Sequence, residues 1–393
     1  MKTMKWKFYS LAFVAGMSIL TACSSDDNND NDGNGGNGNG NEIENGTILK
    51  GTITSDVTLA AGNTYKLSGE YIVEEGATLH IEEGVKIIAV YDDIADYILV
   101  KQGGKINAVG TPDKPIVMTS EKEEPGAWGG IHICGRAHTN AEGGKGSSEI
   151  GGAVYGGNDD ADNSGTLQYI RLEYTGFAFD EEHEANGISF YGVGNGTIVD
   201  HCQAYKGSDD GFEFFGGSVN VSNLVAVSCS DDSFDWTEGW NGKGTNLVAY
   251  QEAESTLGYD CDCLMECDNN GSNNAATPVA HPVLKYLILV GNGGSKQGIR
   301  LRAGTEVEID NAKVCGKGQP LTVETALTEN ALKNGTSKLT NITLTSELSC
   351  KEGIYTHADF IAVTSNKVDA NLSYSSFEDI KKECSWMNGS WVK

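Results

Sequence analysis

Proline and positive charge are both scarce in this sequence. Its 393 residues include 6 prolines, and 28 lysines and arginines stand against 55 aspartates and glutamates, a formal net charge of −27. This acidity argues against nucleic-acid binding, because every phosphate contact needs a cation, and against general adhesion to anionic membrane surfaces. It favours a metal cation such as calcium, or a neutral or cationic partner.

Helical heptads and a membrane-spanning run are also missing. The apolar share is 39%, whereas glycine is abundant at 51 residues. This composition argues against a compact helical protein and favours an all-β chain of short strands joined by glycine turns. The apolar run from Leu11 to Leu20 is too short to span a bilayer comfortably and has the build of a secretory signal.

The residues around that run indicate how the chain is exported. Lys2, Lys5 and Lys7 form a positive region before it, and it ends in Leu-Thr-Ala-Cys at Cys23, which resembles a bacterial lipobox. The resemblance implies that residues 1–22 are a lipoprotein signal peptide. It also implies that Cys23 becomes the mature N-terminus and carries diacylglycerol and palmitate.

Residues 23–45 are predicted to be a flexible tether. The stretch SSDDNNDNDGNGGNGNGN after Cys23 has no apolar residue and therefore has nothing to bury. Acids directly after the lipidated cysteine are similar to the surface-export signal of Bacteroidota lipoproteins. We therefore expect an outer-membrane lipoprotein that contacts the bilayer through Cys23 and faces the cell exterior, with a periplasm-facing anchor as the alternative.

Cysteine usage leaves the pairing of thiols open. Nine cysteines follow Cys23, so at least one is unpaired or pairs outside the chain. The segment CDCLMEC at residues 261–267 has the cysteine density of a metal-binding motif, but no second cluster with ligand spacing follows it. Disulfides or buried thiols at turns are the expectation.

An internal repeat organises the rest of the chain. GSDDGFEFFGG at 207–217 returns as CSDDSFDWTEG at 229–239, and SNLVA at 222–226 returns as TNLVA at 245–249. A period that drifts between about 22 and 25 residues, without leucine-rich spacing, predicts a parallel β-helix of roughly a dozen coils. We assign this solenoid to residues 46–350.

Residues 351–393 break the repeat and are predicted to form a C-terminal cap. Their aromatics, Phe377, Trp386 and Trp391, are expected to cover the open end of the core. A solenoid needs such a cap because its open end otherwise exposes a template for edge pairing.

Several segments carry a resemblance to a known family. They are GATLHIEEGVKI, GGKINAVGT, PIVMTS, WGGIHI, GGNDDADNSGTLQYIRLEYTG and DDGFEFFGG. The chain resembles a large family of secreted bacterial right-handed β-helix proteins, many of them lipoproteins, in the pectate-lyase or pectin-lyase-like fold group. The resemblance implies a right-handed parallel β-helix and implies no particular activity.

Strand alternation separates core from surface in the repeated segments. Because successive side chains take opposite faces of a strand, inward aromatics imply outward acids between them. One coil on, each residue lies beside its equivalent, so aromatics stack, acids form a ladder, and asparagines at the turns form a hydrogen-bonded ladder. The equivalent pairs are Phe212/Phe234, Phe214/Trp236, Glu213/Asp235 and Asn223/Asn246.

The stacked acids are the first candidate site. Repulsion between like charges at strand spacing is on the order of 1 kcal/mol in water and a few in a partly buried site. Calcium relieves it, since this ion takes six to eight oxygen ligands. The acids are otherwise expected to fan out into solvent, keep a proton or accept from backbone amides. The predicted calcium ligands are Asp209, Asp210, Glu213, Asp231, Asp232 and Asp235.

The same face admits a catalytic interpretation. β-Helix enzymes place carboxylates on neighbouring coils as general acid and base across a glycosidic bond, a scheme that Asp210 and Asp232 suit. In a lyase scheme, calcium neutralises a uronate while Lys206, Arg300 or Arg302 removes a proton. The motifs of pectate lyases themselves are not recognisable in the sequence.

Three functional interpretations stay open. The first is a non-catalytic binding or adhesion role toward polysaccharide or a surface protein, with calcium at the acidic coils. The second is a polysaccharide lyase or glycoside hydrolase, and the third is a structural spacer of an outer-membrane assembly. Tyr191, Tyr205 and Trp240 are the predicted platforms for glycan stacking.

Overall fold

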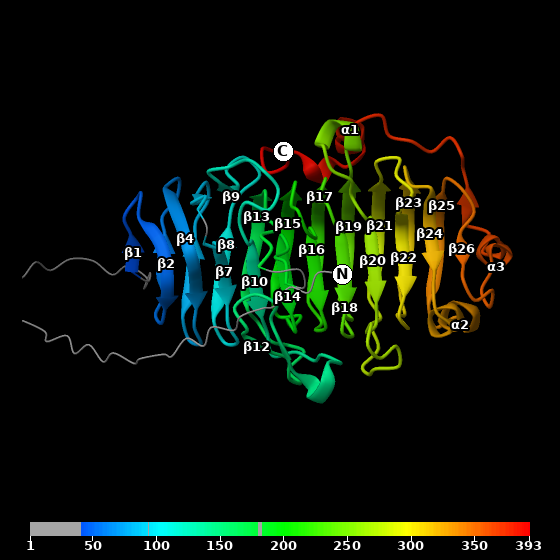
Figure 1. Cartoon of the computed structure of the whole chain (residues 1–393), viewed down its shortest axis with the longest axis horizontal. Helices are drawn as coiled ribbons and strands as arrows, with labels where there is room; N and C mark the ends of the chain where they lie inside the picture. Colours follow the sequence, from blue (N-terminus) through cyan, green and yellow to red (C-terminus); the bar gives the residue numbers. More distant parts are fainter. Residues whose placement is uncertain (1–40, 93, 180–182) are drawn as a thin grey trace, which may run out of the picture. The chain divides into compact units, whose positions relative to one another are not determined.

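The computed structural model describes residues 41–92, 94–179 and 183–393. Its strands are parallel, apart from one small hairpin, and belong to one continuous ladder that coils along the chain (Figure 1). Each strand pairs with the equivalent strand of the coil before and the coil after it. The right-handed parallel β-helix predicted from the sequence is thus confirmed.

One face of the solenoid, called the site-bearing face below, carries the acidic segments. In the described part of the chain eleven strands follow one another along it, in agreement with the roughly dozen coils expected from the repeat. They are β2 (Ile48–Ile53), β4 (Thr64–Val73), β7 (Tyr97–Val100), β10 (Ile131–Cys134), β14 (Ile188–Tyr191), β16 (Phe212–Phe215), β18 (Phe234–Thr237), β20 (Met265–Asp268), β22 (Gln297–Arg302), β24 (Gln319–Val323) and β26 (Ser349–Cys350).

The other two faces are joined by a bend with left-handed backbone. From β13 onwards one long strand covers both faces, pairing with β8 before the bend and with β9 after it. The strands of these faces are β1 (Asn41–Ile43), β3 (Val57–Leu59), β5 (Thr78–Ile81), β6 (Lys86–Ala89), β8 (Lys105–Val109), β9 (Ile116–Ser120), β13 (Gly165–Glu173), β15 (Ile198–Tyr205), β17 (Asn220–Val227), β19 (Lys243–Tyr250), β21 (Val283–Val290), β23 (Glu308–Cys315), β25 (Lys338–Leu344) and β27 (Lys367–Val368).

Asparagine suits this bend because it tolerates positive φ better than most residues. Asn223 and Asn246 have φ of 56° and 59° at equivalent bend positions. Asn246 donates through Nδ2 to Oδ1 of Asn223 at 2.8 Å, and Asn223 donates to Oδ1 of Asp200 at 2.7 Å. The predicted asparagine ladder is confirmed, and it ends at Tyr286, which occupies the bend of the next coil.

Aromatic side chains stack inside the solenoid beneath the acidic coils. Phe212 lies on Phe234 with ring centroids 5.6 Å apart and planes 13° from parallel. Phe214 pairs in register with Trp236, but its ring stacks on Trp240 at 4.1 Å, and Trp236 contacts Trp240 at a tilt. All five are buried, so the predicted inward aromatics are confirmed, with Trp240 added to them.

Short helices close the C-terminal end of the core. They are α2 (Ala326–Asn334) and α3 (His357–Ala362), while α1 (Glu254–Leu257) and α4 (Phe377–Glu383) lie elsewhere on the solenoid. Phe360 of α3 is fully buried and belongs to the same apolar cluster as the core strands, as does Tyr355 just before it. The cap over the core therefore comes from residues around 355–360.

The aromatics of the final segment do not cover the open end, so that prediction is wrong. The tail runs back along the side of the solenoid (red in Figure 1). Trp391 is fully buried there against Val225 and Val248, and Phe377 and Trp386 are partly buried beside it. The physical reason is that valines on the outer side of these strands form a second apolar surface that needs cover.

The cysteines of the described residues are not paired with one another. All nine described cysteines are free thiols, and eight of them are buried. The described residues therefore contain no disulfide, and CDCLMEC contributes buried thiols.

Within those same residues, no helix has the length and apolar character needed to cross a bilayer.

Candidate functional site

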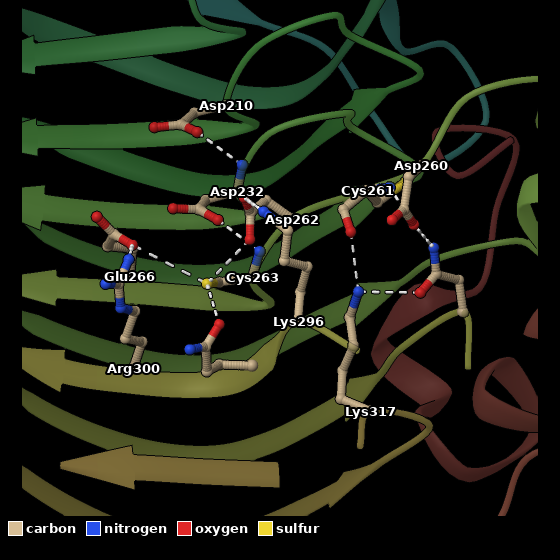
Figure 2. Close-up of polar contacts among 12 residues, drawn as sticks. Asp210, Asp232, Asp260, Cys261, Asp262, Cys263, Glu266, Lys296, Arg300 and Lys317 are labelled. Carbon is tan, nitrogen blue, oxygen red and sulfur yellow. Dashed lines mark hydrogen bonds and ion pairs between the residues drawn. The ribbon is translucent and has the colours of Figure 1, made fainter. Parts of the chain in front are cut away.

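Asp210 and Asp232 occupy one register position at the entry to the site-bearing face. The pairing of β14, β16, β18 and β20 aligns this position with Asn186 one coil earlier and Cys263 one coil later. Asp210 accepts a hydrogen bond from the backbone N–H of Asp232 at 2.8 Å, and Asp232 accepts from that of Cys263 at 2.6 Å. Figure 2 shows the two carboxylates following each other on successive coils.

These two acids therefore have a structural role. Their side chains are 6% and 5% exposed, and each binds the turn of the next coil. Upstream, Asp96 occupies the same register position and accepts from the backbone of Gly69. One alternative given above was that backbone amides stabilise the acids. For Asp210 and Asp232 this prediction is confirmed.

A second column of acids runs along the outside of the strands. Glu213 pairs in register with Asp235, and Asp235 with Glu266. At the upstream end, Asn186 donates to Oε2 of Glu213 at 2.6 Å. At the downstream end, Arg300 pairs with Glu266 at 2.7 Å. The outward direction and neighbouring placement predicted for Glu213 and Asp235 are confirmed.

Carboxylate oxygens from these columns approach one another closely enough to share a cation. In each of four overlapping groups, one ligand atom per residue lies within 4.8 Å of the others. The groups are Asp209/Asp210/Asp231, Asp210/Glu213/Asp235, Asp232/Asp235/Glu266 and Asp232/Asp262/Cys263. All six acids predicted as calcium ligands belong to at least one group.

No ion pair of the described residues includes any of the six acids. Burial outweighs the charges of Arg302 and Lys296, which lower the pKa of Asp235 and of Asp231. Within the described residues, the ion pairs of nearby cations go to other carboxylates: Arg302 binds Glu266 and Asp268, and Lys296 binds Asp262. Burial and the carboxylate of Asp231 raise the pKa of Asp209 to about 8. Asp231 lies nearer the surface, and burial followed by the charge of Asp262 raises its pKa to about 6.

The pKa is raised more strongly in the remaining four acids, which are Asp210, Glu213, Asp232 and Asp235. Burial, followed by the charge of neighbouring carboxylates, raises the pKa of each well above its usual range. Oδ1 of Asp235 is also buried without a hydrogen-bond partner in the described structure. A buried carboxylate oxygen without a donor is costly, and either a proton or a metal ion removes that cost.

The downstream end of the cluster has a different chemistry. Sγ of Cys263 lies 3.4 Å from Oδ1 of Asp262 (Figure 2). The same sulfur lies 3.9 Å from Oε1 of Gln297. Nearby, Nζ of Lys317 is buried and donates to the backbone oxygen of Cys261 at 2.9 Å. The lysine and arginine side chains at this end are therefore already engaged in polar contacts. A metal ion that takes only oxygen ligands fits the upstream groups better, because they contain no sulfur.

The predicted proton acceptors are engaged in ion pairs. Lys206 pairs with Glu252 at 2.8 Å, and Arg300 binds Glu324 at 3.2 Å as well as its partner in the acid column. Arg302 is held by two carboxylates, as described above. These contacts favour the charged form of each side chain, so none of the three is poised as a base.

Two of the three predicted stacking platforms are buried, so their predicted exposure is wrong. Tyr191 points outward but lies under the insertion that carries the hairpin β11 (Gly146–Ser147) and β12 (Val154–Tyr155), with the ring of Tyr155 at 5.1 Å. Trp240 enters the core, as described above. Tyr205 is half-buried, with the ammonium of Lys393 4.7 Å from its ring centroid.

Glu266, Asp262 and Asn186 are site residues that the sequence reasoning missed. Glu266 follows its register partner Asp235 by 31 positions, because α1 and its flanking loops lengthen that coil beyond the 22 to 25 residues of the repeat. Asn186 carries a signal, since NGISF is aligned with DGFEF. At the register position of Asp210, this coil carries an amide in place of a carboxylate.

Comparison with known proteins gives one match. A family model described as a pectate-lyase like beta helix domain matches residues 51–393. No curated protein and no solved structure matches the chain.

The raised pKa values predict that the cation-free protein loses stability as pH rises. Folded Asp209 keeps its proton up to about pH 8, whereas an unfolded Asp ionises near about pH 3.9. Its contribution is therefore fully present below about pH 4 and is lost as pH rises through about 8. Melting measured in chelator should show a lower melting temperature at pH 8 than at pH 5.

Asp209→Asn should reduce that dependence by the share of Asp209, because an amide has no proton to lose, while the other shifted acids keep the rest. Glu254→Gln, which removes an exposed acid on α1, should leave it unchanged. Equal melting temperatures of the unsubstituted protein at the two pH values would contradict the prediction.

Proposed function

Since the chain belongs to the pectate-lyase-like β-helix family, we propose that it is a lipid-anchored protein of the cell surface that binds polysaccharide without cleaving it. Calcium at the acidic coils orders the binding face. The observation that carries the proposal is the set of six carboxylates on adjacent coils. They belong to overlapping groups of three whose ligand atoms lie within 4.8 Å of one another, and none has an ion-pair partner among the described residues.

Calcium suits this cluster better than the other common divalent ions. It accepts six to eight oxygens in irregular geometry, which overlapping carboxylate groups supply, whereas magnesium demands near-ideal octahedral geometry. Zinc prefers nitrogen and sulfur ligands, and the upstream groups contain neither. The ion replaces the protons that the raised pKa values imply.

Three observations support binding over catalysis. Asp210 and Asp232 are buried and hydrogen-bonded to backbone, so they do not face a substrate as an acid and base pair. Lys206 is tied to Glu252, and the two arginines are tied to the end of the acid column. A static binding face fits these contacts better than a proton-transfer site.

Polysaccharide is the proposed ligand because of the family and the geometry of the face. Membership of a pectate-lyase-like family points to a polysaccharide-related role. Stacked coils form an extended surface, which matches a polymeric ligand better than a small molecule. A neutral or calcium-bridged chain also avoids the repulsion that a net charge of −27 imposes on free polyanions.

The anchor and the surface location rest on the N-terminal sequence. Cys23 and most of the tether lie outside the described residues, so the support is the lipobox-like Leu-Thr-Ala-Cys and the acidic stretch after it. A tether before the first coil gives the solenoid reach from the outer membrane.

Calcium should stabilise the protein. At a concentration of about 100 times its Kd, one bound ion adds about 2.7 kcal/mol to the free energy of unfolding. Melting of metal-stripped protein with and without calcium measures this effect. The double substitution Asp209→Asn and Asp231→Asn should remove most of it, while Glu254→Gln should not. An unchanged melting temperature on adding calcium rejects the calcium assignment.

Lipidation should depend on Cys23 alone. Labelled palmitate fed to expressing cells should enter the protein, and Cys23→Ser should abolish the label and release the protein from the membrane fraction. Cys350→Ser, which removes a half-buried thiol of the solenoid, should retain both. Label that persists in Cys23→Ser would rule out the proposed anchor.

Retention without cleavage is the expected behaviour toward polysaccharide. The chain without its anchor residue, residues 24–393, is passed over plant, host and bacterial polysaccharides in calcium, and new reducing ends and ultraviolet-absorbing lyase products are followed. We expect retention on at least one polymer, and no products. Cleavage that Asp210→Asn or Asp232→Asn abolishes would make the protein an enzyme; neither retention nor cleavage would favour a structural spacer.

A further inference from the structure

A cleft of about 950 Å³ opens at the N-terminal coils of the site-bearing face. It is lined by the middle of β2 and of β4, by the start of β7 with the residues just before it, and by residues 177–179. It is distinct from the acid cluster, since none of the six predicted calcium ligands lines it.

Large apolar side chains line the cleft although they are open to solvent. Ile94 is 58% exposed and Phe179 is 41% exposed. The ring of Phe179 meets Tyr97 edge-on at 6.0 Å and Phe177 edge-on at 5.2 Å. These contacts position the ring of Phe179, and its exposed part offers an apolar, aromatic surface to a ligand.

Polar groups lie at the rim of the same cleft. Lys50 is exposed and has no ion-pair partner in the described part of the chain. Ser68 adds a hydroxyl, and Glu70 accepts from the hydroxyl of Tyr97 at 3.0 Å, which leaves its other oxygen available. Donors and acceptors beside an apolar wall are the arrangement of a small-molecule or sugar subsite.

The cleft and the acidic coils share one edge of the site-bearing face. Asp96, next to the cleft residues Ala95 and Tyr97, has the same register position as Asp210. Three strand spacings separate them, about 14 Å along the solenoid. A polymer is long enough to span this distance, whereas a single sugar is not.

We propose that this cleft binds a sugar ring of a neutral, β-linked glucan, as a subsite of the polysaccharide-binding face; this rests on the proposed function. A glucose ring with equatorial hydroxyls presents C–H groups on its faces and hydroxyls at its edge. The faces fit Phe179 and Ile94, and the edge hydroxyls fit Lys50, Ser68 and Glu70. The charged side chains that line the cleft, Lys50 and Glu70, have opposite signs, so the cleft carries no net charge that would select a carboxylated sugar.

Binding of cellohexaose to the full chain, kept in detergent with calcium present, tests the subsite. Phe179→Ala should weaken the affinity measured by calorimetry about tenfold, a loss of one sugar–aromatic contact. Tyr286→Ala is the matched control, because it removes an aromatic side chain that is 52% exposed on another face. Lys50→Ala is a second cleft variant that leaves the apolar wall intact and should also weaken binding.

The outcomes separate this inference from the proposed function. If the unsubstituted protein binds cellohexaose and both cleft variants bind equally well, or if only Tyr286→Ala weakens binding, the cleft is not the subsite. If the protein is retained on charged polysaccharides but not by cellohexaose, the neutral-glucan assignment is wrong while the proposed function stands. If it binds no glycan at all, the proposed function fails first. Equal melting temperatures of the variants verify that each is folded.

Discussion

Register between parallel coils is the constraint on which the rest of this structure depends. Every residue of the solenoid lies about 4.8 Å from its equivalent on the next coil. For Phe212 and Phe234 that distance gives ring stacking, and for Asn223 and Asn246 it gives a shared hydrogen bond. For carboxylates the same distance gives repulsion on the order of 1 kcal/mol or more. Aromatics and asparagines that repeat at equivalent positions therefore stabilise the stacked coils, whereas ionised acids that repeat there destabilise them.

The acids of the two repeated segments differ in how this repulsion is offset. The carboxylates of Asp210 and Asp232 accept hydrogen bonds from backbone N–H groups of the next coil, which makes them part of the scaffold. Glu213 and Asp235 point outward and have no ion pair among the described residues, whereas Glu266, the next acid of the column, pairs with Arg300. One repeated motif thus supplies both a structural ladder and a set of oxygens suited to a divalent ion. The hydrogen bonds of Asp210 and Asp232 tie successive coils together and so help to keep the outward acids in register.

Prediction from sequence succeeded where the repeat was regular. The 22-residue offset placed Glu213 beside Asp235 and the phenylalanines inside, since alternation along a strand leaves only two directions for a side chain. It failed where an insertion interrupts the repeat. Glu266 was missed because its coil is longer, and Tyr191 was misjudged because a hairpin inserted after β10 covers a side chain that does point outward.

By itself the sequence determined the period, the alternation and the identity of the stacked residues, because local spacing alone sets these in a solenoid. The tertiary structure decided which acids face the backbone and which face outward, where the tail lies, and where a cleft opens. Trp391 illustrates the reason: its partners Val225 and Val248 lie on coils more than 140 residues earlier in the chain. No local pattern encodes that pairing, since the apolar surface exists only once the coils are stacked.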